Sequence, residues 1–151
     1  MAHIRYQFFA DDAHEKGFIG IEKLFRALSK SAFYHAKNYF SVLNKIQGID
    51  YNLKESRAIE KADIAELGSK YLPYSAKAHL SLAQYAFGEA YGAKNNYSGL
   101  LPEAIKAYKR REDIGQYSYY VCTSCGNTGR LEGELEHCPI CGAPLDKIII
   151  I

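Results

Sequence analysis

The 151-residue sequence has no tryptophan, a single methionine, and no cysteine in its first 121 residues. It also lacks any apolar run that approaches the roughly 20 residues of a membrane-spanning helix. The opening residues Met1–Tyr6 do not show the cationic region and apolar segment of a secretory signal peptide. These absences favour a soluble cytoplasmic protein over a membrane or secreted one.

An excess of charge of one sign is also missing, since 19 Lys and Arg residues against 17 Asp and Glu residues give a net charge of +2. The densest basic patch, at residues 106–111, is typical of a solvated helix face. We therefore expect no nucleic-acid partner. Neither a glycine-rich phosphate loop nor a nucleophile paired with a base can be recognised, so no catalytic residue is named.

The four cysteines that are present form two Cys-x-x-Cys pairs near the C-terminus: Cys122 with Cys125, and Cys138 with Cys141. Such a turn bends tightly enough for both sulfurs to face one ion, and four thiolates complete a tetrahedral site. Gly126 and Gly142 follow the two pairs and allow a positive φ and amide N–H groups close to the sulfurs. Two disulfides are the alternative, but they suit a secreted domain.

Helical periodicity characterises the sequence as far as about residue 112. The expected helices cover residues 2–16, 21–47, 52–91 and 102–112, with Pro73 kinking or splitting the third and residues 92–99 forming a turn. Gly17 and Gly48 are expected to end the first two. The second helix carries a long apolar stripe, which a helix buries only against other long helices. This pattern predicts a helical bundle.

A second, smaller domain is expected after a linker at residues 115–118. The predicted division is a helical domain over residues 1–115 and a β-rich metal-binding domain over residues 118–151. Tyr119–Val121 and Lys147–Ile151 are the β-prone segments that flank the cysteines. A domain of about 33 residues is too small to fold on a hydrophobic core alone, so a metal ion would supply much of its folding energy.

Several short segments resemble a known family. They are Met1–Tyr6, Phe9-Ala10, Gly17-Phe18, Leu24–Ala27, His35–Asn38 and the tail Cys138–Pro144. This layout, a helical bundle followed by a four-cysteine knuckle, resembles the rubrerythrins over about residues 1–50 and 118–148. The resemblance is poor over residues 60–115.

The resemblance implies an all-α ferritin-like bundle with a C-terminal rubredoxin-like domain. It implies an NADH-linked oxidoreductase that reduces hydrogen peroxide at two irons and takes part in the response to oxidative stress. It further implies that electrons reach the di-iron site from the rubredoxin-like iron, usually of the partner subunit in a dimer.

Di-iron bundles take a glutamate from each of two helices and a Glu-x-x-His pair from each of the other two. By the resemblance, His35 stands at the histidine position of the second helix, while Ala32 replaces its glutamate. The glutamate of the first helix would precede Met1. The pair of the fourth helix would fall near Ala90 and Ala93, which have no ligand atoms.

The third helix offers two alignments with the family's pair of acidic residues. Counting forward from its start places Glu60 and Asp63 at the pair, whereas counting back from Pro73 places Ile64 and Leu67 there. At best three ligands of a di-iron site remain, namely His35, Glu60 and Asp63. Retention of a second, di-iron cofactor and of peroxidase activity is therefore left open.

Two functions are consistent with this sequence. One is a rubrerythrin-like non-haem iron protein in electron transfer and peroxide detoxification, with iron at the four cysteines and a redox partner protein. The other is a non-enzymatic helical protein whose four cysteines hold a structural zinc ion. The preference for iron comes from the resemblance alone. Because the apolar stripe of the second helix needs cover, we also expect a homodimer or higher oligomer.

Overall fold

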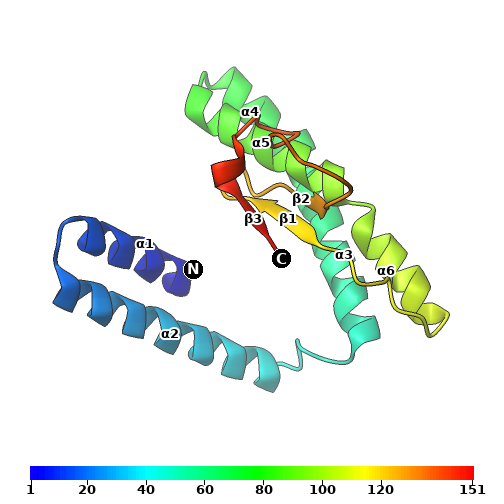
Figure 1. The fold of residues 1–151 in the computed structure, drawn as a ribbon, viewed down its shortest axis with the longest axis horizontal. Helices are drawn as coiled ribbons and strands as arrows, with labels where there is room; N and C mark the ends of the chain where they lie inside the picture. Colours follow the sequence, from blue (N-terminus) through cyan, green and yellow to red (C-terminus); the bar gives the residue numbers. More distant parts are fainter. The chain divides into compact units, whose positions relative to one another are not determined.

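The computed structural model describes all 151 residues, and their contacts divide the chain into two parts, Met1–Gln47 and Gly48–Ile151. The first part is an antiparallel helical hairpin of α1 (Ala2–Glu15) and α2 (Ile19–Val42), coloured blue in Figure 1. Ala10 and Ala13 are buried where the helices meet, because small side chains let them approach closely. Ser29 on α2 donates to the carbonyl of His3 at 3.0 Å.

The apolar stripe of α2 is not buried within this hairpin. Leu24 is 56% exposed, and Leu43, directly after the helix, is 66% exposed. The reason is geometric, since the 14 residues of α1 cover only one face of the 24 residues of α2. Phe25 faces α1, where its ring packs against Tyr6 and Phe9.

The helix ends differ from the prediction in an instructive way. Gly17 ends α1 with φ 78°, as expected, but α2 ends at Val42 and not near Gly48. Asn44 takes φ 52°, and the amide of Lys45 donates to the carbonyl of Phe40 at 2.8 Å. Asparagine tolerates this left-handed conformation better than most residues, so it can close a helix as glycine does.

The second part contains the remaining helices. They are α3 (Ile49–Glu66), the π-helical turn η1 (Leu67–Tyr71), α4 (Leu72–Lys77), α5 (Ser81–Tyr97) and α6 (Leu100–Lys109). Pro73 does not interrupt the helical path from α3 through η1 to α4. Proline has no amide N–H to donate, and the π turn directly before it changes the hydrogen-bond spacing at this point. The break comes at His79, with φ 55°.

The predicted turn at residues 92–99 is also wrong for most of its length, because α5 continues to Tyr97. Gly92 lies inside α5, and a Cβ atom there would be 3.3 Å from Cγ2 of Ile140. This glycine therefore serves a close approach between α5 and the cysteine-containing loop. Only Ser98 and Gly99 separate α5 from α6.

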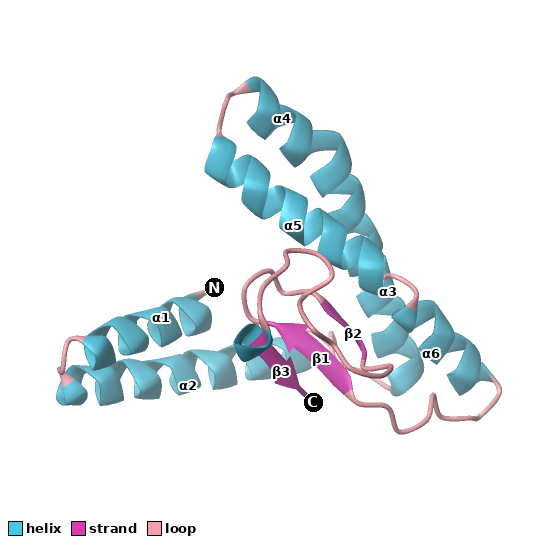
Figure 2. Ribbon diagram, turned by 45° about the horizontal axis from the view of Figure 1, so that its top comes forward, coloured by secondary structure: helices cyan, strands magenta, loops and turns pink.

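A three-stranded antiparallel sheet in the order β2-β1-β3 completes the second part (Figure 2). Its strands are β1 (Tyr119–Cys122), β2 (Thr128–Arg130) and β3 (Ile148–Ile150). The flanking strands β1 and β3 were expected, whereas β2 was not, because three residues inside the cysteine loop carry no periodic signal. None of the helices combines the length and apolar character that a membrane crossing needs.

Candidate metal centre

The four cysteine sulfurs come together, with all four Sγ atoms within 4.8 Å of one another. The Sγ atoms of Cys122 and Cys141 are 3.7 Å apart, and those of Cys125 and Cys138 are 3.6 Å apart. A tetrahedral ion with metal–sulfur bonds of about 2.3 Å needs sulfurs about 3.8 Å apart. The thiols are free, and these separations are far longer than the about 2.05 Å of a disulfide. The residues present thus fit one thiolate-bound ion.

The two Cys-x-x-Cys turns have the same backbone geometry. The amide of Gly126 donates to the carbonyl of Cys122 at 2.9 Å, and that of Gly142 donates to the carbonyl of Cys138 at 2.9 Å. Their φ angles are 74° and 71°, in the left-handed region that favours glycine. The positive φ expected of the two glycines is confirmed.

Backbone amides also donate to the sulfurs. Burial raises the pKa of the Cys125 thiol, although the Asn127 amide opposes the shift. For Cys138, burial again acts to raise the pKa, but hydrogen bonds from the amides of Cys141 and Ile140 and from the side chains of Cys125 and Cys141 together bring the pKa to about 7. Donors of this kind soften thiolate charge and tune a bound metal.

The cysteine-containing module is attached to α5 through the buried amide of Asn127. Asn127 is fully buried, and its Nδ2 donates to the hydroxyl of Tyr120 at 3.1 Å. Its Oδ1 accepts from Nδ2 of Asn96 on α5 at 3.1 Å. Sequence reasoning missed Asn96 and Asn127, because a single asparagine belongs to no sequence pattern that predicts a hydrogen bond to a distant residue. They connect the metal centre to the helices.

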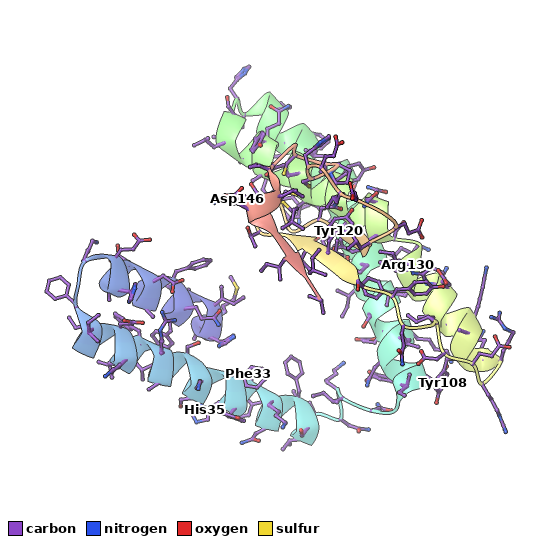
Figure 3. All side chains as sticks on the ribbon, in the orientation of Figure 1. Phe33, His35, Tyr108, Tyr120, Arg130 and Asp146 are labelled. Carbon is purple, nitrogen blue, oxygen red and sulfur yellow. The ribbon has the colours of Figure 1, made fainter.

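A second attachment joins β2 to α6. Arg130 bonds Glu103 at 2.6 Å, and its guanidinium lies 4.1 Å from the ring centroid of Tyr117. Figure 3 shows Arg130 and Tyr120 extending from neighbouring strands. Arginine can form two hydrogen bonds to one carboxylate and can stack on an aromatic ring, so it holds a fixed orientation better than lysine would. The module thus packs on the helices in the second part of the chain, while the predicted boundary between residues 1–115 and 118–151 stays a prediction.

No protein-family model matches the chain. Over 161 aligned residues, however, it is 30% identical to Rubrerythrin-2 of Clostridium acetobutylicum, with 97% of this chain and 87% of the relative covered. The chain belongs to the rubrerythrin family. Structures of nigerythrin in the mixed-valence and fully reduced states match with TM-scores of 0.56 and 0.60, at 22% and 21% identity, covering 99% of this rubrerythrin-family chain and 79% of theirs. They support the predicted fold class, a ferritin-like helical bundle followed by a rubredoxin-like domain.

The weaker ligand candidates of this rubrerythrin-family chain lie elsewhere. His35 is exposed on α2, where its ring centroid is 6.5 Å from that of Tyr39. Glu60 and Asp63 lie on α3 in the other part of the chain, so their sharing of a site with His35 stays a prediction. Both carboxylates pair with Lys94. Apart from the four cysteines, neither part of the chain has a group of three or more possible ligands at coordinating separation.

Proposed function

We propose that this rubrerythrin-family protein carries electrons through an iron ion held by Cys122, Cys125, Cys138 and Cys141, in the response to oxidative stress. The observation that supports the proposal is the tetrahedral spacing of four sulfurs in a member of this family. Iron bound by four thiolates supplies one-electron chemistry. The chain's own residues hold the ion, shield it from water and donate amide hydrogen bonds to its ligands.

The exposure of the ligands indicates where electrons enter. Cys122 and Cys138 are buried, whereas Cys125 and Cys141 are partly exposed. Beside the second turn lies a surface groove of about 510 Å³, lined by Tyr85 and Glu89 of α5 and by Ile140. We infer that a redox partner protein approaches the centre from this more exposed side. Four free thiols also suit a reducing compartment such as the cytoplasm.

Metal content and colour test the proposed function against a structural zinc site. Protein purified from iron-supplied cells is expected to be red, with one iron per chain, and to bleach on reduction with dithionite. The same chain loaded with zinc is the matched control and should be colourless, because zinc has no redox chemistry. A colourless native preparation with one zinc per chain would make the structural zinc protein the correct function.

We also propose that the chain forms a homodimer or a higher homo-oligomer. Support comes from the exposed apolar stripe of α2, where Leu24 and Leu28 meet solvent. Sedimentation equilibrium should give at least twice the 17.0 kDa chain mass. Leu28→Glu should shift the protein toward monomer, and Lys23→Glu on the polar face should not. A wild-type mass of one chain would contradict this proposal.

A further inference from the structure

A lysine connects α5 to the two acidic residues of α3. Nζ of Lys94 lies 2.7 Å from Oε2 of Glu60 and 3.0 Å from Oδ2 of Asp63. Tyr97, one turn further along α5, donates its hydroxyl to the same Glu60 oxygen at 3.2 Å. The side chains of Lys94 and Glu60 are only 20% and 26% exposed. The two carboxylates are therefore already neutralised in part, from within the chain.

The position of this cluster is informative because Glu60 and Asp63 are the acidic pair that one alignment assigns to di-iron ligands. The facing helix should then supply a carboxylate and an imidazole. Instead it has Ala90 and the buried Ala93, which carry no ligand atoms, and directly after them comes Lys94. The groups that meet at this interface are two carboxylates, one ammonium and the Tyr97 hydroxyl, and this set does not fit a di-iron site.

The local charges also oppose a metal ion. A cavity of about 180 Å³ beside Glu60 is lined by Arg57 and Lys61 in addition to Glu60 itself. Partial burial acts to lower the pKa of Lys94, but the hydrogen bonds to Glu60 and Asp63 raise it more, so the amine stays protonated. A divalent ion between the two carboxylates would have to displace the Lys94 ammonium, because two cations repel each other strongly at such distances.

We propose that the ammonium of Lys94 takes the place of a metal ion at Glu60 and Asp63. The helices then carry no iron, and the chain holds a single metal ion at its four cysteines. This goes beyond electron transport, because it states that any peroxide chemistry of this protein does not rest on a di-iron centre in its own helices. A site made by His35, Glu60 and Asp63 is the alternative.

Manganese titration of the full-length protein tests the proposal. With zinc filling the cysteines, free Mn(II) measured by electron paramagnetic resonance should show no bound ion in the wild type. Mn(II) prefers oxygen ligands, so Lys94→Glu should bind one additional Mn(II) per chain. Lys16→Glu is the matched control, since Lys16 also pairs with an acidic residue, Asp12 at 2.7 Å, but on an exposed surface. Mn(II) binding by the wild type would overturn the proposal, as would a folded Lys94→Glu variant that binds no more than the control.

A second variant decides the matter if Lys94→Glu does not fold. Lys94→Met removes the cation without adding a charge and leaves two partly buried carboxylates facing each other. Its Tm should fall by roughly 5 °C. The exposed control Lys16→Met should shift Tm by about 1 °C or less, because exposed ion pairs contribute little. Equal shifts in the two variants would show that Lys94 is an ordinary surface lysine and would overturn the proposal. Neither experiment depends on the redox activity of the cysteine-bound ion.

Discussion

Cys138→Ser is expected to abolish metal binding and to unfold residues 119–151 while the helices stay folded. Cys138 is 1% exposed, and its sulfur faces that of Cys125 at 3.6 Å. The sheet has strands of only three or four residues, so it cannot hold the module together without the ion. For structural zinc in small peptides the binding free energy, about 10–16 kcal/mol, is also the folding free energy.

Hydrogen exchange followed by mass spectrometry measures this effect segment by segment. In Cys138→Ser, the amides of β1 and β3 should lose their protection, while circular dichroism should retain the helical signal. Ser124→Ala is the control, because Ser124 is exposed within the first Cys-x-x-Cys turn and is no metal ligand. Protected strand amides in a metal-free Cys138→Ser variant would contradict a metal-dependent fold.

Asn127→Leu should give the second-largest loss, about 1–3 kcal/mol in the free energy of unfolding of the metal-loaded protein. The substitution leaves the buried Tyr120 hydroxyl without its partner, which costs about 1–3 kcal/mol, and it removes one of the two hydrogen bonds of the exposed Asn96 amide. Because Asn96 belongs to α5, the same change should also loosen the module from the helices.

Urea unfolding measures the loss, and a neighbouring residue supplies the control. Asn95→Ala removes an amide that bonds only the Tyr91 carbonyl of its own helix at 2.8 Å, so it should cost less than about 1 kcal/mol. A double-mutant cycle between Asn127→Leu and Asn96→Ala should give a coupling energy of at least about 0.5 kcal/mol. Additive effects would mean that the amide pair does not connect the module to α5.

Local signals in the sequence predicted the metal centre well, because its geometry is itself local. Two Cys-x-x-Cys turns, each followed by glycine, fix their own backbone shape, and the structure has both glycines at positive φ. Only the convergence of the two turns depends on the rest of the chain. Asn127 was missed because its partners are Tyr120 and Asn96, which only the fold brings close to it.

The helices show where local signals stop being sufficient. The apolar stripe of α2 predicted the helix correctly but not its end, since Asn44 and not Gly48 supplies the left-handed residue. Gly92 looked like part of a turn, yet it is the place where α5 meets Ile140. Glycine provides either conformational freedom or space, and a sequence alone does not distinguish these uses.

The contact between Lys94 and the pair Glu60 and Asp63 could not be predicted either. It joins residues more than thirty positions apart and depends on the register in which α3 and α5 face each other. In the sequence, the acidic residues Glu60 and Asp63 are present, whereas most of the ligands expected from the other helices are missing. The structure adds that a cation of the chain itself lies between them.

A redox titration of the iron-loaded protein, followed in the visible spectrum, tests the central claim that one thiolate-bound iron is the working centre. We expect a single reversible one-electron transition per chain, which is absent from the zinc-loaded protein. The absence of any transition in iron-loaded protein would contradict electron transport by the four-cysteine site. Additional electrons taken up per chain would contradict the claim that this is its only metal centre.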